Sequence, residues 1–331
     1  MSGNALPIQK LLVADTLKLD DIQRDGLYGR GWLLAHYLML SDARTGQPRA
    51  YLDAINAGKA PLEAAQVFGD LRKLDRELED YKRGTFKVMK LSGTAIKTAP
   101  VELRKCTPGE AATMDVRIRS KVGVDSKTSL GVYQRAKRAA APHPDDHGAQ
   151  MVLAEAAYDA GDFVTAEAAA DRALKANPKS VDGHVYKAMA RMGVARKAGD
   201  KTPATWSAIR KIIAAGNRID PEDPEPLILY YRSFVDAGAT PSANAKDGLH
   251  KAFELAPQDN RLRFNLATML LRDGNKARAR AMLAPLAYQP HGKGLAMAST
   301  TLIKLIDSGD TDAVIRELDK SRDDKNEPEE A

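Results

Sequence analysis

A unit of two helices, joined by a glycine turn and closed by a proline, recurs along this chain. Its clearest copy is AGDFVTAEAAADRALKANP, residues 160–178. Gly161 can end the first helix in the left-handed conformation, and Pro178 stops the second helix at the residue before it. Ala166 and Ala173 lie seven positions apart and share one face of the second helix. Their small side chains predict a close contact with the first helix.

Prolines at similar intervals mark further copies of this unit. They are Pro144, Pro178, Pro221 and Pro257, spaced by 34, 43 and 36 residues. Gly274 and Gly309 supply the turns of two more pairs. One pair cannot bury its apolar face alone, so the sequence predicts about five stacked helix pairs over residues 107–320, followed by a polar tail at 321–331.

The repeating unit resembles the tetratricopeptide repeat, a helix-turn-helix unit of about 34 residues. The residues that carry the resemblance are Leu153, Gly161, Asp162, Phe163, Ala166, Ala173 and Pro178. Gln150 and Ala170 stand where the family has larger residues. The resemblance implies an all-α solenoid, a right-handed superhelix whose concave groove binds a peptide or helix of a partner protein. The groove positions that it implies are Glu155, Tyr158, Asp159, Met189, Met192, Arg232, Asp236, Thr268 and Arg272.

Residues 1–85 carry apolar side chains at helical spacing but no copy of the repeat, which predicts a small helical subdomain. Four stretches resemble the region after the catalytic core of gluzincin metallopeptidases, which are similar to thermolysin. They are Tyr28–Leu38, Tyr51–Gly58, Glu63–Gly69, which has one extra residue before its phenylalanine, and Leu74–Tyr81. The resemblance implies that this chain is the C-terminal part of a longer, bacterial peptidase-like protein.

A short β-hairpin is expected between these two regions, over residues 86–106. The segment TFKVMKLSGTAIKTAPVELRKC alternates apolar and polar residues around a Ser-Gly turn. The predicted order is therefore a helical subdomain, a hairpin linker, the helix pairs and the tail.

Chemistry-bearing motifs are sparse. A gluzincin requires His-Glu-x-x-His to hold zinc and activate water, and the chain has no such sequence. His143 and His147 lie close together in a loop between prolines, where Asp145 or Asp146 is expected to cap the next helix instead of joining a metal site. Cys106 precedes a predicted helix start and is weighed as a reactive thiol. We expect a chain that is not an enzyme, with no cofactor and no metal.

Charge is unevenly distributed. The chain has a formal net charge of +6, whereas residues 82–138 contain fourteen Lys and Arg against four Asp and Glu. Such a segment can bind nucleic acid or an anionic surface. It has few aromatic residues and no recognition motif, so nucleic acid is not the expected partner. A single cysteine and no apolar run of about 20 residues leave a soluble chain in the cytoplasm or the periplasm, with the choice open.

Three functions follow from these observations. The leading one is a non-catalytic scaffold that binds a partner protein of unknown identity in the concave groove. The second is an accessory region that presents substrate to a metallopeptidase. The third is a basic binder of nucleic acid or an anionic surface through residues 82–138.

Overall fold

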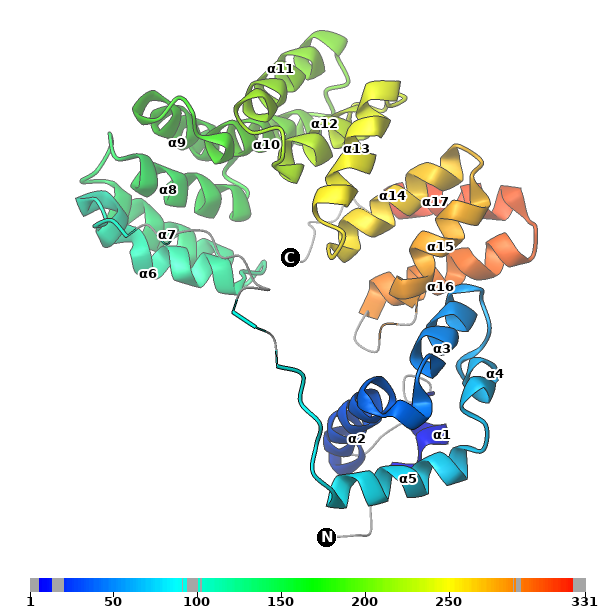
Figure 1. Cartoon of the computed structure of the whole chain (residues 1–331). Coiled ribbons are helices and arrows are strands. Elements are labelled where there is room, and N and C mark those ends of the chain that lie inside the picture. The colour runs from blue at the N-terminus through cyan, green and yellow to red at the C-terminus, as the bar shows by residue number, and fades with distance from the viewer. Residues whose placement is uncertain are drawn as a thin grey trace. The chain divides into compact units, whose positions relative to one another are not determined.

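Every regular element in the described part of the chain is helical, which confirms the predicted all-α class (Figure 1). The computed structural model describes residues 6–13, 21–90, 92–93, 101, 103–287, 289 and 293–323. Contacts divide the chain into two compact units. Unit 1 comprises Met1–Val101 and Gly274–Thr311, and unit 2 comprises Glu102–Asp273 and Asp312–Ala331. The domain boundaries expected from the sequence at residues 85, 106 and 320 stay predictions.

Unit 1 contains two sets of helices. The first set is α1 (Ile8–Leu11), α2 (Asp21–Leu40), α3 (Gln47–Asn56), α4 (Pro61–Ala64) and α5 (Leu71–Arg83), with 3-10 turns at Asp42–Arg44 and Ala65–Phe68. The second set is α15 (Lys276–Ala287) and α16 (Lys293–Asp307), which pack against each other, and α15 also contacts α3.

Apolar side chains of α2 and α5 form the core of the first set. Leu33, Leu34, Leu74 and Leu78 are buried there together with Phe68. On one side of the core the rings of Trp32, His36, Tyr81 and Phe86 pack together, and the Tyr81 hydroxyl lies 2.8 Å from a ring nitrogen of His36. Tyr37, Phe68, Leu74 and Tyr81 come from the stretches that carry the peptidase resemblance. Those stretches therefore supply the contacts that fold this subdomain.

Arg44 ties the 3-10 turn after α2 to α5. Its buried guanidinium donates to the Glu77 carboxylate through Nε at 3.0 Å and to the carbonyl oxygen of Phe68 at 2.8 Å. The Tyr37 hydroxyl donates to the same carboxylate at 3.1 Å. The ion pair lowers the pKa of Glu77 although burial alone would raise it. Arg44 is therefore a structural cation of unit 1.

The expected hairpin over residues 86–106 is not seen. Residues 86–90 and 103–106 have no regular structure, and residues 94–100, which include most of its second strand, lie outside the described residues. The described part of the first strand makes other contacts. Phe86 packs against Trp32, and Lys87 forms an ion pair with Asp42 at 2.8 Å. Alternation of apolar and polar residues did not suffice to form a strand here.

Unit 2 is a stack of helix pairs. Its helices are α6 (Pro108–Val122), α7 (Ser129–Ala140), α8 (His147–Asp159), α9 (Phe163–Ala176), α10 (Val181–Lys197), α11 (Pro203–Ile219), α12 (Pro224–Asp236), α13 (Ala243–Leu255), α14 (Asn260–Arg272) and α17 (Thr311–Asp323). From α6 to α14, each helix packs against the next one in the chain. This arrangement is the predicted solenoid of helix pairs. None of the described helices is long and apolar enough to cross a membrane.

Alanine dominates the contact between α8 and α9. Ala154, Ala157, Ala166, Ala170 and Ala173 are all fully buried. Side chains this small let the two helix axes approach closely, because interaxial distance depends on the residues at the contact. The predicted roles of Ala166 and Ala173 are confirmed.

The turn between α8 and α9 is fixed at both ends. Gly161 has φ of 75°, as expected for a residue that ends a helix in the left-handed conformation. Its N–H bonds to the carbonyl of Tyr158, and the N–H of Asp162 bonds to that of Ala157. The Asp162 carboxylate then accepts from the backbone N–H of Thr165 and caps α9. Similar glycines, Gly199, Gly238 and Gly274, follow α10, α12 and α14.

Replacement of Arg44 by leucine should destabilise unit 1 by about 3 kcal/mol, because it leaves the Glu77 carboxylate without its cation and the Phe68 carbonyl without a donor. Arg49→Leu is the control, since Arg49 is exposed and lies 3.8 Å from Asp53, so a change within about 0.5 kcal/mol is expected. Hydrogen exchange of peptides from α2 and α5 measures the stability of unit 1 in both variants. Equal protection in the two variants would contradict a structural role for Arg44.

Gly193→Ala should destabilise unit 2 by about 1–2 kcal/mol, because a Cβ at this position would lie 2.6 Å from the ring of Phe163. Gly131→Ala is the control, since nothing lies within 4 Å of a Cβ there. It should stabilise α7 by up to about 1 kcal/mol through helix propensity. Urea denaturation can be followed through the buried Trp206 in a Trp32→Phe background. Stabilisation by both changes would show that Phe163 moves aside freely.

Candidate functional site

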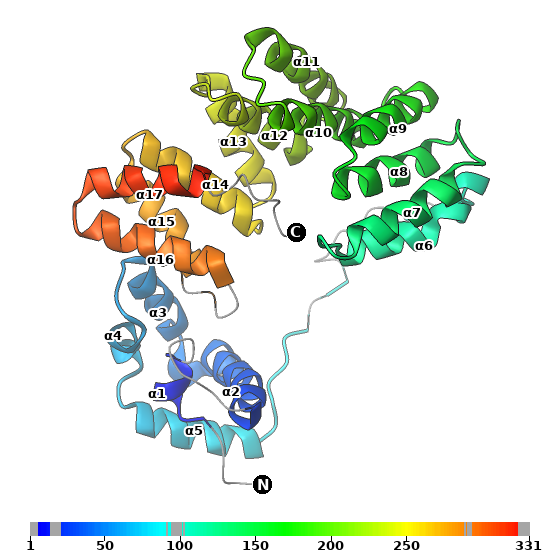
Figure 2. The ribbon, with the colours of Figure 1, turned by 180° about the vertical axis from the view of Figure 1, so that it is seen from behind.

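The candidate site lies on the first helices of the pairs in unit 2. α6 packs against α8, α8 against α10, and α10 against α12. The second helices α7, α9, α11 and α13, all of which are described, do not pack against one another to a comparable extent. When the first helices of successive pairs pack more closely than the second helices, the stack curves toward the first helices. Figures 1 and 2 show α9 and α11 on the outer side of unit 2. We call the inner face of α8, α10 and α12 the groove.

Side chains from all three helices meet on the groove. The rings of Tyr158 on α8 and Tyr186 on α10 lie 6.4 Å apart in an edge-to-face arrangement. Arg196 of α10 donates to the Tyr158 hydroxyl at 3.4 Å and to an Asp236 carboxylate oxygen on α12 at 3.0 Å. Arg232 lies one turn before Asp236 and approaches the same oxygen at 3.7 Å. These bonds tie the first helices of three successive pairs together.

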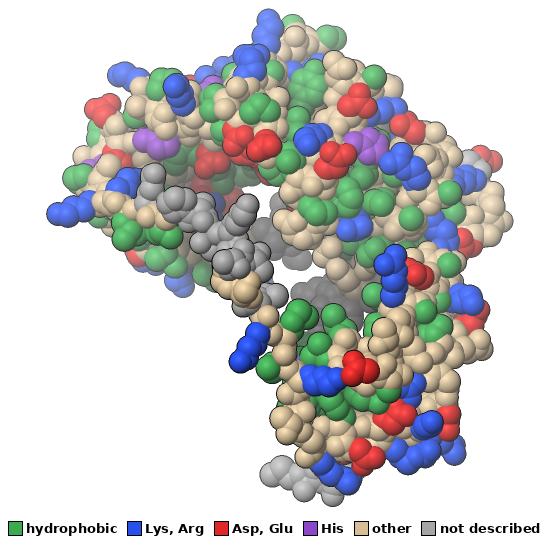
Figure 3. Space-filling view, viewed as in Figure 1, with side chains coloured by type: hydrophobic (Ala, Val, Ile, Leu, Met, Phe, Trp, Pro, Cys, Tyr) green, Lys and Arg blue, Asp and Glu red, His purple; other side chains and the backbone are tan. Residues whose placement is uncertain are grey.

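Four carboxylates are near enough to Tyr186 on this face for their charges to act on it. They are Glu155 and Asp159 of α8, Asp182 of α10 and Glu225 of α12. Removal of the phenol from water and the nearby negative charges together raise the pKa of Tyr186. Figure 3 shows acidic side chains gathered in a hollow of unit 2 where α8 and α10 lie. We call Tyr186 and the four carboxylates the Tyr186 cluster.

Two carboxylates of this cluster touch solvent but are poorly hydrated. Asp159 is exposed by surface area, yet the protein around it raises its pKa to about 6, and the charge of Glu155 adds to the effect. Glu225 is also exposed, and its pKa is likewise raised, mainly by loss of hydration. A group that reaches water and is still enclosed by protein atoms on most sides lies in a concavity. The surface area and the pKa shifts therefore agree with a hollow face.

Five of the nine groove positions implied by the sequence lie together in this region. They are Glu155, Tyr158, Asp159, Arg232 and Asp236. Met189 is half-buried against the apolar cluster of α10 and α11. Met192 requires a correction, because its side chain is 1% exposed and lies in that cluster with Trp206 and Ile213. It therefore packs inside the stack and not on the groove surface.

The two positions on α14 make other contacts. The Thr268 hydroxyl donates to the carbonyl of Asn265 at 2.8 Å, and the exposed Arg272 donates to the carbonyl of Leu318 on α17 at 3.4 Å. Neither hydrogen bond connects these residues to the Tyr186 cluster. The part that the nine residues play in binding stays a prediction.

Tyr186 and Arg196 were missed by the sequence reasoning. A fixed step of 34 residues from Tyr158 reaches Met192, which is buried. The better reference is the turn glycine, because Tyr158 lies three residues before Gly161 and Arg196 three before Gly199. α10 is longer than α8, with 17 residues against 13, so a fixed period loses register between them.

The residues weighed for chemistry have structural contacts. The Asp146 carboxylate caps α8 by accepting from the N–H of Ala149 at 2.9 Å, as expected. A ring nitrogen of His147 lies 3.1 Å from the carbonyl oxygen of Ala173, and the His143 carbonyl accepts from the Gln150 amide. Cys106 is exposed. Within the described ranges, no three His, Cys, Asp or Glu side chains are placed to hold a metal ion.

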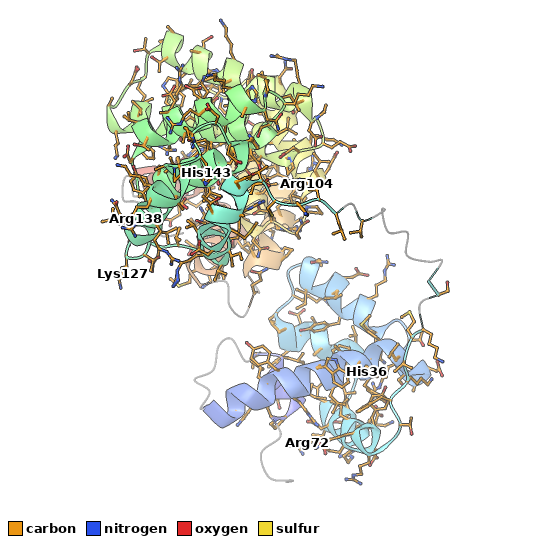
Figure 4. All side chains as sticks on the ribbon, turned by 90° about the vertical axis from the view of Figure 1, so that its left-hand side faces the viewer. His36, Arg72, Arg104, Lys127, Arg138 and His143 are labelled. Atoms are coloured by element: carbon orange, nitrogen blue, oxygen red, sulfur yellow. The ribbon has the colours of Figure 1, made fainter. Side chains whose placement is uncertain are left out.

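The basic residues of segment 82–138 are distributed over several elements and partly neutralised. The ion pairs formed there include Lys87–Asp42, Arg104–Glu110, Lys121–Glu155 and Arg135–Asp115. In unit 2, Figure 4 shows Arg104 well apart from Lys127 and Arg138. It also places His36 on α2 of unit 1. The positive charge in the sequence therefore does not form one continuous patch on unit 2.

Comparison with known proteins gives similarity of fold over part of the chain. No family model and no curated protein matches the sequence. One similar solved structure is TTC0263, described as a thermophilic TPR protein in Thermus thermophilus, with 16% identity, a TM-score of 0.49, and coverage of 58% of this chain and 97% of that one. Another is the MamA RS-1 ArsTM double mutant, with 15% identity, a TM-score of 0.40, and coverage of 54% and 92%. Neither similarity assigns a function to this chain.

Asp159 should titrate near pH 6 in the folded protein, against 3.8 for an ordinary aspartate. Because the folded pKa is raised, the carboxylate lowers stability as the pH rises from about 4 to about 6. Asp159→Asn should therefore stabilise unit 2 at pH 7 and have no effect below pH 4. NMR of 13C-labelled aspartate carboxyls measures the titration. Asp162, whose pKa is lowered by its hydrogen bond from the Thr165 N–H, is the internal control. A normal pKa for Asp159 would contradict the enclosed geometry of the groove.

Proposed function

We propose that the chain is a non-catalytic scaffold that binds a segment of a partner protein along the groove. The main support is the meeting of α8, α10 and α12 on one concave face, where tyrosine rings and charged groups from all three helices reach solvent. A segment lying across these helices contacts three pairs at once. Each pair then contributes a small part of the binding surface, as is common in solenoids.

The groove is suited to recognition for a second reason. Tyr158 and Tyr186 are half-buried, so their positions are set by the fold while part of each ring reaches solvent. Tyrosine gives a large contact area at low cost in conformational entropy. Arg196 and Asp236 hold the first helices together without the partner. The surface is therefore organised before binding, which reduces the entropy that binding has to overcome.

The setting in which the scaffold acts is a further part of the proposal. The resemblance of Tyr28–Leu38 and Leu74–Tyr81 to a post-catalytic peptidase region supports a role as the C-terminal part of a longer peptidase-like protein. In that setting the groove either recruits a partner or presents substrate to the catalytic part. The third candidate, a basic binder of nucleic acid, has less support, because several of its cations are in ion pairs.

Site-specific photo-cross-linking tests the proposal. A photoreactive phenylalanine analogue replaces Tyr186 on the groove, or Val164 or Leu130, which are exposed on α9 and α7. In cells of the native organism, a protein adduct is expected at position 186 but not at 164 or 130. Adducts of equal yield at all three positions would show that the groove is not the contact surface, and adducts confined to α7 would favour the basic segment.

A further inference from the structure

The Tyr186 cluster has more negative charge than the protein neutralises. Glu155 has a partner, since the Lys121 ammonium lies 2.8 Å from its carboxylate. Asp159, Asp182 and Glu225 are exposed, and among the described residues none of these three forms an ion pair. The charge of Arg232 lowers the pKa of Glu225 from a distance, without a direct ion pair between them. Three carboxylates from three helices thus face one half-buried ring without a direct cation.

Several carboxylates in other parts of both units are held by cations at short distances. Examples are Asp75–Arg30, Glu77–Arg44, Glu167–Arg191, Asp236–Arg196 and Asp307–Arg280. The whole chain has a net charge of +6, so cations are not scarce. The groove nevertheless contains three exposed carboxylates that form no ion pair among the described residues. This charge is complementary to a cationic partner.

The ring in the middle of the carboxylates favours the same class of partner. Tyr186 presents an aromatic surface, and Tyr158 lies beside it. A lysine or arginine side chain can place its aliphatic stem against such rings and its charge near the carboxylates. The cluster therefore combines an apolar contact with acidic groups, which a simple acidic surface does not.

The neighbouring part of the groove limits where the cation can bind. Arg196 and Arg232 both approach Asp236, so this carboxylate is already held by cations. A basic side chain is therefore attracted toward the carboxylates of α8 and the start of α10 instead of Asp236. The distribution of charge along the groove gives a bound segment one preferred position.

We infer that the occupant of the groove is a lysine- or arginine-containing segment of a partner protein, with a basic side chain bound over Tyr186 between Asp159, Asp182 and Glu225. This inference rests on the proposed function and names the chemistry of its partner. A cation at this position compensates the loss of hydration that is the main cause of the raised pKa values of Asp159 and Glu225.

Selection from a random 12-residue phage-display library tests the inference on the full chain. Selected peptides should be enriched in Lys and Arg relative to the unselected library. Their affinity, measured by fluorescence anisotropy, should fall by about tenfold or more for Asp159→Asn/Glu225→Gln and should weaken with added salt. Asp247→Asn/Glu254→Gln removes the same charge from exposed residues of α13 and should change affinity by less than about twofold.

The other outcomes separate the two proposals. Selected peptides that are not basic, but lose affinity for a Tyr158→Ala variant, would overturn the inference of a basic partner and leave the groove as the binding surface. Absence of binders, or binders unaffected by all groove variants, would overturn the proposed function as well. Sedimentation could instead show that the free chain forms dimers and that Asp159→Asn/Glu225→Gln dissociates them. That result would identify a second copy of the chain as the occupant and overturn the inference of a different partner protein.

Discussion

The close contact between alanine-lined helix faces is the interaction on which unit 2 depends. Ala154, Ala157, Ala166 and Ala170 are fully buried where α8 meets α9. Each alanine buries little area, so the stack is stabilised by many small contacts and by dense packing instead of a few large side chains. Helices that approach this closely bring the first helices of successive pairs side by side. The groove, its tyrosines and its charges are consequences of that spacing.

Charge is arranged on this scaffold in two ways. Ion pairs such as Arg196–Asp236 join helices and are part of the folded structure. Three carboxylates around Tyr186 form no ion pair among the described residues. The raised pKa values of two of them, Asp159 and Glu225, indicate that these two oppose folding at neutral pH. Groups that lower stability are common where a protein binds something else, because selection on function offsets their cost. The groove fits this description, whereas the surface of α6 and α7, where acids and bases pair, does not.

Local sequence rules predicted the repeat well and the site only in part. Gly161, Asp146 and the alanines of α9 act through neighbours a few residues away, so their roles could be read from the sequence. Met192 was misplaced because α10 is longer than α8 and the 34-residue step loses register. The Tyr186 cluster could not be predicted, since its carboxylates come from three helices spread over some 70 residues. Their combined effect on Tyr186 depends on how the fold brings these helices together. The described part of the expected first strand, residues 86–90, has no regular structure, because alternation of apolar and polar residues alone does not specify a strand.

The sequential packing of unit 2 also determines how it opens. Each helix pair touches only the pairs before and after it, so the array can fray from its ends, and an inner pair can open while distant pairs stay folded. A segment bound across α8, α10 and α12 spans three of these pairs at once. Opening any one of them then requires the segment to leave. Occupancy of the groove would thus convert three loosely coupled pairs into one cooperative block, and resistance to proteases would be gained across the whole middle of the array.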